Sequence, residues 1–248
     1  MKFGVIFVIS WLALMGSLVS AQGELSEPEY SVIFEKDVPI RVRDGTVLRA
    51  DVYRPDVPQG NTEKFPVLLS LSAYQKAMDR ILPHEPPFTH VERPEPDWWV
   101  PRGYTLVFID TRGTGTSPGQ SDLWSMQEAW DYYDAIEWAA DQSWSNGKVG
   151  LVGVSYYEIT QWNVSSLQPP SLTTIVPWEG WADMYRDSVF HGGIFNQGFY
   201  GRWWLDVRGK QLLENTRADN SAALSEDCLL YTSPSPRDLS TSRMPSSA

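Results

Sequence analysis

The sequence predicts an α/β fold with a mostly parallel central sheet and flanking helices. Three apolar runs lack the alternation of a half-exposed strand and indicate strands buried on both faces; they are residues 66–71, 104–109 and 148–153. Between the last two runs, residues 128–141 carry apolar side chains at helical spacing and predict a helix over one face of the sheet. Strand, helix and strand in this order are typical of a parallel βαβ unit.

An antiparallel hairpin is predicted ahead of these strands. From residue 30 to residue 55, apolar and polar side chains alternate, as they do in a strand with one buried face. Asp44-Gly45 interrupts the alternation, and Asp-Gly is a favoured two-residue hairpin turn. We therefore expect residues 30–55 to form two paired strands.

After the third buried strand, the sequence predicts a helix and a strand, followed by a region of different composition. Residues 156–167 predict a helix, which Pro169-Pro170 ends, and residues 172–177 predict one further strand. Residues 178–209 are rich in Trp, Gly, Asp and Arg without strand periodicity. This composition indicates a loop and the start of a helical lid near residue 178.

Composition and charge narrow the class of protein. The 248 residues are 42% hydrophobic and 21% charged, which is ordinary for a globular chain. The formal net charge of -11 and the lack of any basic run argue against a nucleic-acid partner, because phosphate binding needs clustered Lys and Arg. Cys228 is the only cysteine, so burial of a core rather than a disulfide framework must hold the fold.

The N-terminal segment has the features of a secretory signal peptide. Lys2 supplies a positive charge, residues 3–19 form an apolar run, and small residues precede Gln22. We expect cleavage after Ala21, which predicts a secreted or periplasmic protein with no stable membrane association once residues 1–21 are removed. An uncleaved membrane anchor is the alternative, because the apolar run is just long enough to span.

The last segment, residues 228–248, differs in composition from the rest of the chain. Ser, Pro, Arg and Thr dominate it, and such a composition cannot bury a core. It resembles the translated adapter tail of a sequencing library, and a natural disordered C-terminus is the alternative. We therefore expect the folded domain over residues 30–227.

Ser155 is the candidate nucleophile. It follows Gly153-Val154 at the junction of an apolar strand and a helix, the context of a nucleophile elbow. A sharp turn there lifts the serine oxygen clear of the sheet and aims the next backbone N–H at the developing oxyanion. A serine that merely opens a helix is the alternative, but the strand, turn and helix together favour the nucleophile. Tyr157 stands where a Gly-x-Ser-x-Gly motif has its second glycine.

Several separate segments resemble one protein family in the same order along the chain. They are Arg43-Asp44-Gly45-Thr46-Val47-Leu48, Asp51-Val52-Tyr53-Arg54-Pro55, Asp97-Trp98-Trp99, Gly103-Tyr104, Asp110-Thr111-Arg112-Gly113-Thr114-Gly115, Gly147-Lys148-Val149-Gly150 and Ser155-Tyr156. Across residues 30–205 the chain resembles the cocaine esterase and X-Pro dipeptidyl-peptidase branch of the α/β-hydrolases. The resemblance implies an α/β-hydrolase fold and a serine hydrolase that acts on a small-molecule ester or short peptide without cofactor or metal. The chain departs from the family at Glu158, where the family usually carries glycine.

Two residues are expected to form the oxyanion hole. Tyr156 follows the nucleophile, so its backbone N–H is the first donor by position. The resemblance implies that the hydroxyl of Tyr74, after an earlier strand, is the second donor. A loop tyrosine that only packs its ring is the alternative for Tyr74.

The catalytic acid and histidine are not assigned to residues of this chain. In this fold they follow the nucleophile in the order serine, acid, histidine. His191 is the only histidine after Ser155, and Asp187 precedes it. We do not join them to Ser155, because only one strand is predicted between Ser155 and His191, whereas the fold takes its acid and base from loops after later strands. We therefore expect a domain incomplete at its C-terminus, and an inactive truncated fragment is one hypothesis for the chain.

The substrate class stays open at this stage. Trp178 and Trp181 are candidates for lining a substrate pocket, and core packing is the alternative. An X-Pro dipeptidyl peptidase or an α-amino acid ester hydrolase is the alternative to a simple acyl esterase. Such an enzyme must neutralise a free amine with carboxylates, for which Glu179 and Asp183 are candidates. The oligomeric state is not indicated by the sequence.

Overall fold

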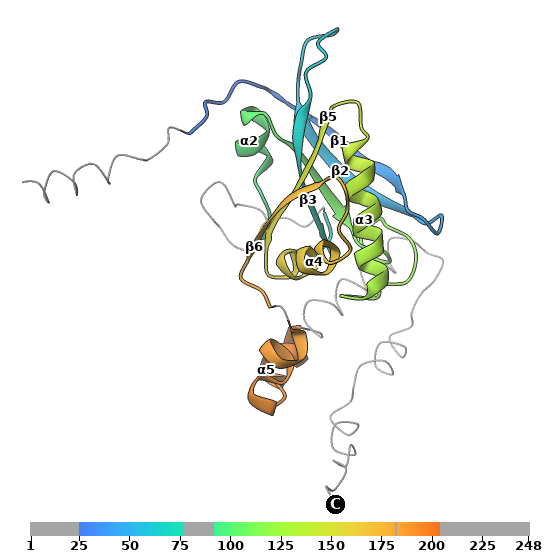
Figure 1. The fold of residues 1–248 in the computed structure, drawn as a ribbon, viewed down its shortest axis with the longest axis vertical. Helices are drawn as coiled ribbons and strands as arrows, with labels where there is room; N and C mark the ends of the chain where they lie inside the picture. The colour runs from blue at the N-terminus through green and yellow to red at the C-terminus, as the bar shows by residue number, and fades with distance from the viewer. Residues whose placement is uncertain (1–24, 77–91, 182, 204–248) are drawn as a thin grey trace, which may run out of the picture.

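The fold is described from a computed structural model that covers residues 25–76, 92–181 and 183–203 (Figure 1). The expected signal peptide, residues 1–21, and the expected tail, residues 228–248, lie outside these ranges. His84 and His90, which the sequence places in a Pro-rich loop, also lie outside them.

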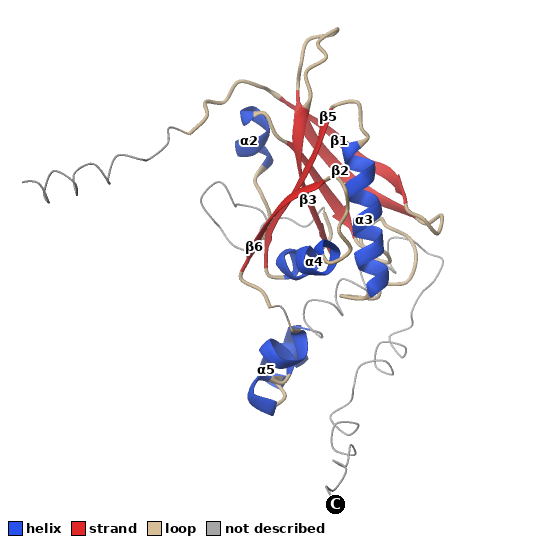
Figure 2. Cartoon of the chain, in the orientation of Figure 1, coloured by secondary structure: helices blue, strands red, loops and turns tan. Residues whose placement is uncertain are grey.

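A six-stranded mixed sheet forms the centre of the molecule (Figure 2). Its strand order is β1-β2-β4-β3-β5-β6. The strands are β1 (Val32–Arg41), β2 (Val47–Pro55), β3 (Phe65–Ser72), β4 (Thr105–Asp110), β5 (Ser145–Val154) and β6 (Leu172–Trp178). β1 and β2 form the predicted hairpin, and β2 is antiparallel to β4. The pairs β4–β3, β3–β5 and β5–β6 are all parallel, which confirms the mostly parallel sheet.

Helices cover both faces of this sheet. The elements besides the strands are α2 (Pro96–Trp99), η1 (Val100–Arg102), α3 (Met126–Ala140), α4 (Tyr156–Ser165), a π-helical turn η2 (Met184–Val189), η3 (His191–Gly193) and α5 (Gln197–Trp203). α3 and α4 pack against each other and against β3 and β5, so they share one face. α2 and η1 pack near β4 and β2.

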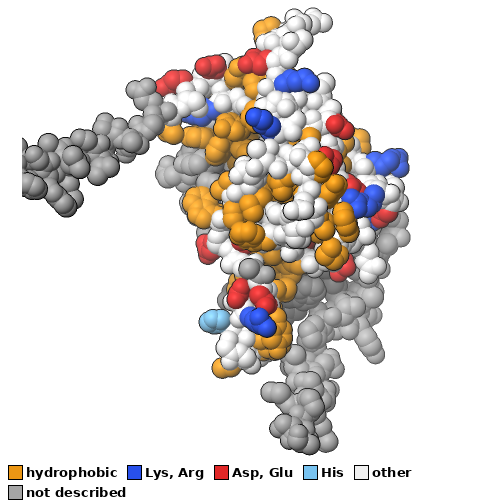
Figure 3. Space-filling view, viewed as in Figure 1, with side chains coloured by type: hydrophobic (Ala, Val, Ile, Leu, Met, Phe, Trp, Pro, Cys, Tyr) orange, Lys and Arg blue, Asp and Glu red, His pale blue; other side chains and the backbone are white. Residues whose placement is uncertain are grey.

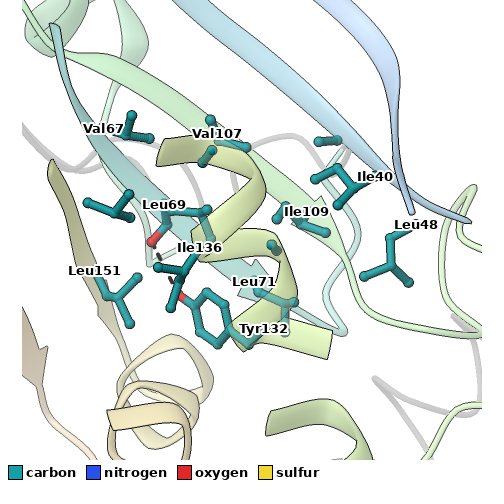
Figure 4. Packing of buried hydrophobic residues seen from close by; sticks show 14 of the residues in the cluster. Ile40, Leu48, Val67, Leu69, Leu71, Val107, Ile109, Tyr132, Ile136 and Leu151 are labelled. Carbon is teal, nitrogen blue, oxygen red and sulfur yellow. Dashed lines mark hydrogen bonds between the residues drawn. The ribbon is translucent and has the colours of Figure 1, made fainter. Parts of the chain in front are cut away.

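The larger hydrophobic core lies between α3 and the sheet (Figure 4). Tyr132 and Ile136 of α3 pack over Leu69 and Leu71 of β3 and over Leu151 of β5, all essentially inaccessible to solvent. The Tyr132 hydroxyl donates a hydrogen bond to the Leu69 carbonyl at 3.2 Å, so its polar atom is satisfied inside the core. Burying each of these large side chains stabilises the fold by about 1.5–3 kcal/mol.

A second, smaller core covers the opposite face. Val100 of η1 packs with Leu106 and Phe108 of β4, and Leu68 of β3 joins them. Successive residues of a strand point to opposite faces, so Leu68 faces this core while Leu69 faces α3. Cores on both faces explain why the apolar runs of the central strands do not alternate.

The first turn of α3 is set by a polar cap. The Ser125 side chain accepts a hydrogen bond from the Glu128 N–H at 3.2 Å, and Glu128 Oε2 accepts one from the Trp124 N–H at 2.8 Å. The serine thus satisfies one of the otherwise unpaired N–H groups of the helix start, and the glutamate holds the residue before the cap. The helix therefore begins at Met126, slightly before the predicted residue 128.

An ion pair ties the hairpin turn to the same helix. Arg43 Nη2 lies 2.7 Å from Asp134 Oδ1 of α3, and the guanidinium lies 3.9 Å from the centroid of the Trp130 ring. The contact joins residues far apart in sequence and fixes the hairpin against α3.

β6 forms the edge of the described sheet. Val176 and Trp178 of β6 and Trp162 of α4 are each about half exposed. Figure 3 shows hydrophobic side chains gathered at the surface on this side of the molecule. In the part of the chain that the structure describes, no helix has the length and apolar character needed to cross a membrane.

Candidate active site

The backbone at Ser155 is held in a conformation that costs energy. Its φ of 58° and ψ of -114° lie outside the regions that residues with a side chain normally adopt, and such a residue costs on the order of 1–3 kcal/mol. Ser155 stands between the last residue of β5 and the first residue of α4. This is the strand-to-helix turn that the sequence predicts.

Hydrogen bonds on both sides of the turn maintain this strained conformation. The Ser155 N–H donates to the carbonyls of Trp178 and Glu179 at 3.0 and 3.1 Å. The Val154 N–H donates to the Glu92 carbonyl at 2.9 Å, and the Ser155 carbonyl accepts from the first turn of α4. The turn is therefore determined by contacts from the loop around Glu92 and from the end of β6, as well as by its own helix.

Two glycines make room for the large side chains that follow the serine. A Cβ at Gly153 would lie 2.4 Å from the Cβ of Tyr157, and a Cβ at Gly180 would lie 1.2 Å from Glu158 Oε2. Tyr157 and Glu158 are both buried. The turn therefore accommodates the large side chains of Tyr157 and Glu158 because residues 153 and 180 have no side chain.

Tyr74 lies beside the nucleophile. It follows the end of β3, where its N–H donates to the Ser72 hydroxyl at 2.9 Å. Its own hydroxyl lies near the Ser155 side chain and accepts from Trp203 Nε1 at 3.3 Å. Burial raises the pKa of the Tyr74 phenol, with a smaller contribution from the charge of Glu92. The phenol is therefore protonated at neutral pH and can donate to an oxyanion.

Tyr156 contributes from the other side of the turn. It is the first residue of α4, and backbone N–H groups at a helix start point away from the helix and favour negative charge. Its buried side chain donates a hydrogen bond to Glu128 Oε1 at 2.6 Å, which ties the start of α4 to the start of α3. The rings of Tyr74 and Tyr156 lie 5.6 Å apart. The structure thus brings Ser155, Tyr74 and Tyr156 together.

Glu92 is a site residue that sequence reasoning missed. Its carboxyl lies near the Ser155 side chain, and its backbone carbonyl accepts from the Val154 N–H. Burial, and to a smaller extent the charge of Glu179, raise the pKa of Glu92 to about 7, and the neighbouring Ser155 hydroxyl opposes this rise. The residue stands in a loop without periodicity or motif, so no signal in the sequence marked it.

The structure does not bring Asp187 and His191 to the nucleophile. Asp187 Oδ2 accepts from the Asp183 N–H at 3.0 Å, and the Asp183 side chain accepts from the Arg186 N–H at 3.0 Å. These acids therefore stabilise the turn η2, while His191 is exposed at the start of η3. Among the described residues, no hydrogen bond or ion pair joins Ser155 to either Asp187 or His191.

The two predicted pocket tryptophans lie in different surroundings. Trp178, at the end of β6, is 52% exposed. Trp181 packs edge-on to Trp124 at 5.9 Å between ring centroids. Trp124 in turn stacks on Trp203 and contacts Tyr156. Trp181 therefore belongs to an aromatic cluster that reaches the predicted oxyanion hole, whereas Trp178 contacts the turn through its carbonyl.

The sheet, its helices and the strained serine at the strand-to-helix turn define an α/β-hydrolase. The sequence pattern of the X-Pro dipeptidyl-peptidase (S15) family matches residues 44–239. The chain belongs to this family.

Individual relatives point to the same family. The chain is 36% identical over 157 residues to a cocaine esterase of Rhodococcus sp. (strain MB1 Bresler), a match that covers 63% of the chain and 25% of the relative. It is 29% identical over 120 residues to a putative Xaa-Pro dipeptidyl-peptidase of Bacillus cereus, covering 42% of the chain and 20% of the relative. A crystal structure of a CocE/NonD family hydrolase from Staphylococcus aureus superposes with a TM-score of 0.66 at 42% identity, covering 73% of the chain and 33% of that protein. The chain thus spans between a fifth and a third of the length of these relatives.

The strain at Ser155 predicts an unusual order of stabilities. The free energy of unfolding of Ser155→Gly is expected to be about 1–2 kcal/mol higher than that of Ser155→Ala, because glycine adopts a positive φ without strain. The control pair at Asn163, in the interior of α4, is expected to show the opposite order, since glycine costs about 1 kcal/mol relative to alanine inside a helix. Urea denaturation of the four variants measures the difference. The same order at both positions would contradict a strained turn.

The burial of the Glu92 carboxyl beside Ser155 predicts a specific pH dependence. The folded-state pKa of Glu92, about 7, lies above the ordinary value of 4.5, so the folded protein binds this proton more tightly than the unfolded chain does. The resulting stabilisation is complete below about pH 4.5 and is lost as the pH rises through 7. The free energy of unfolding of Glu92→Gln minus that of the wild type is therefore expected to increase over this window.

Removing the serine hydroxyl provides a second check on the same contact. The neighbouring Ser155 hydroxyl lowers the pKa of Glu92, so Ser155→Ala is expected to move the window to higher pH. Parallel stability curves for the wild type and Glu92→Gln between pH 4.5 and 7 would show that Glu92 is not buried beside Ser155.

Proposed function

We propose that this chain carries the nucleophile and oxyanion hole of a serine hydrolase that cleaves ester or amide bonds through an acyl-enzyme on Ser155. One observation carries the proposal: a strained serine at a strand-to-helix turn lies against the hydroxyl of Tyr74 and precedes the N–H of Tyr156. Membership of the S15 family supports it.

In the proposed reaction the Ser155 oxygen attacks the carbonyl carbon of the substrate. The serine proton passes to a base, and the carbonyl electron pair moves onto the oxygen. The Tyr156 N–H and the Tyr74 hydroxyl then donate to this oxyanion. Collapse of the intermediate expels the alcohol or amine and leaves an acyl group on Ser155, which water removes. In this fold the base is a histidine C-terminal to the nucleophile.

We favour an acyl esterase as the first candidate. The relative that is 36% identical is named a cocaine esterase, and the similar crystal structure is a CocE/NonD family hydrolase. The aromatic cluster of Trp124, Trp181 and Trp203 beside Tyr74 and Tyr156 suits an acyl group of apolar or aromatic character.

A second candidate is a peptidase or ester hydrolase whose substrate carries a free amine. Glu92 contacts Ser155, and Glu179 is near enough to raise the pKa of Glu92 by its charge. Two carboxylates beside the nucleophile would attract an ammonium group. Asp183, the other predicted amine ligand, is engaged in capping η2 instead.

We also propose that the protein is exported. The charged residue, apolar run and small residues at the N-terminus support this proposal. A mature N-terminus at Gln22 in the secreted protein, read by mass spectrometry, would establish it.

A fluorophosphonate probe tests the nucleophile. We expect slow labelling of Ser155, because no histidine contacts it among the described residues, and no labelling of Ser155→Ala. Tyr74→Phe is expected to slow labelling by a further ~10²-fold, the usual cost of losing an oxyanion donor. Tyr132→Phe is the matched control, since this buried tyrosine bonds a core carbonyl. Labelling rates are followed by mass spectrometry of the intact chain. Rapid labelling that His191→Ala abolishes would contradict our placement of His191 outside the catalytic site.

A substrate panel separates the two candidates. p-Nitrophenyl esters and X-Pro amides are compared, each with a free and an acetylated amine. An acyl esterase is expected to cleave the esters in both forms. A requirement for the free amine, lost in Glu92→Gln and Glu179→Gln, would favour the second candidate, and turnover of amides alone would exclude the simple esterase.

A further inference from the structure

Lys76 stands out because its ammonium group is buried among three aspartates. Its side chain is 1% exposed, and Nζ lies 2.6 Å from Asp37 Oδ1, 3.2 Å from Asp51 Oδ1 and 3.7 Å from Asp110 Oδ2. Asp51 and Asp110 belong to β2 and β4, and Asp37 lies within β1. One side chain from the turn after β3 is therefore bound to all three strands on that side of the sheet.

The backbone of Lys76 is held as firmly as its side chain. Its N–H donates to Asp110 Oδ1 at 2.6 Å, and its carbonyl accepts from Arg93 Nη2 at 2.7 Å. Gln75, immediately before it, has a left-handed φ of 70°. The path of the chain from Tyr74 to Lys76 is thus restricted at both ends.

The carboxyl group of Asp110 is itself enclosed by the following loop. Asp110 Oδ2 accepts from the Thr116 N–H at 2.8 Å. A Cβ at Gly115, which has a φ of +52°, would lie 2.1 Å from the same oxygen. The loop can wrap this carboxyl only because residue 115 has no side chain, so the position of the acceptor for Lys76 is determined by the loop as well as by β4.

This cluster is directly connected to the oxyanion hole. Tyr74 is separated from Lys76 by the single strained residue Gln75, and its hydroxyl must reach Ser155 to act as a donor. A positional error of about 1 Å in a catalytic group is enough to cost ~10²-fold in rate. Contacts that fix Lys76, two residues from Tyr74, therefore bear on catalysis and not only on stability.

We propose that Lys76 is a positioning residue for Tyr74: its ion cluster with Asp37, Asp51 and Asp110 holds the turn after β3 so that the Tyr74 hydroxyl meets Ser155. The inference rests on the proposed function, because it assigns Lys76 a role in the oxyanion hole of that hydrolase. The Arg43–Asp134 ion pair provides the control, since it links the hairpin turn to α3 and has no contact with the turn that carries Tyr74.

The first experiment observes Tyr74 without requiring any reaction. The chain is produced with 3-fluorotyrosine, and the ¹⁹F resonance of Tyr74 is assigned by its loss in Tyr74→Phe. Lys76→Met is expected to shift or broaden this resonance while leaving that of Tyr132 in place, and Arg43→Met is expected to leave both unchanged. An unchanged Tyr74 resonance in folded Lys76→Met would overturn the proposal.

The second experiment measures the consequence at Ser155. Lys76→Met is expected to slow fluorophosphonate labelling about tenfold, a part of the ~10²-fold cost of losing an oxyanion donor. In a background that carries Tyr74→Phe, the same substitution is expected to change the rate less than twofold. Lys76→Arg, which keeps the charge, is expected to recover most of the rate. Equal slowing with and without Tyr74 would overturn the proposal, because it would show that Lys76 does not act through Tyr74.

If Lys76→Met does not fold, Asp110→Asn weakens the same cluster while keeping the shape of the side chain, and the same shift of the Tyr74 resonance is expected. If Ser155 does not react with the probe in any variant and the Tyr74 resonance still responds to Lys76→Met, then the proposed hydrolase function fails and the positioning of Tyr74 by Lys76 stands.

Discussion

The parallel pairing of β4, β3, β5 and β6 is the constraint on which the rest of the structure depends. Parallel strands end at the same edge of a sheet, so the residues that follow them become neighbours whatever their distance in sequence. Tyr74 follows β3, Ser155 follows β5, and Glu179 follows β6. The hydrogen bonds from the Ser155 N–H to the end of β6 exist because these strand ends coincide. Strand direction therefore brings the site residues together, and their side chains then supply the chemistry.

Burial of charge gives this edge its rigidity. Lys76 and Asp110 are nearly inaccessible to solvent, and a buried ion is tolerated only where partners replace its water. The same principle applies at Glu128, whose carboxylate accepts from the Tyr156 hydroxyl and the Trp124 N–H. Each group is bound to more than one element, so a shift in any element would leave a charge without its partners. Lys76 thus ties the turn that carries Tyr74 to the strands, and Glu128 ties Tyr156 to α3.

The strained backbone at Ser155 is maintained by this rigid surrounding. Strain at one residue persists only where neighbouring contacts over-determine the conformation. Here the contacts come from three sources: the loop at Glu92, the end of β6 and the first turn of α4. The large side chains of Tyr157 and Glu158 follow the strained serine directly. They fit because Gly153 and Gly180 leave space for them.

Local patterns in the sequence determined the elements of this protein, and only the tertiary structure decided which of their residues meet. Periodicity depends on near neighbours, so the buried strands, the hairpin, α3 and the turn at Ser155 could be predicted from the chain alone. Tyr74 was indicated only by resemblance, since nothing local relates it to Ser155. The contact of Glu92 with the nucleophile and the burial of Lys76 among three aspartates could not be predicted. They depend on the order in which β2, β4 and β3 pair and on the path of a loop without periodicity, and these are set by long-range packing that leaves no repeating signal in the sequence.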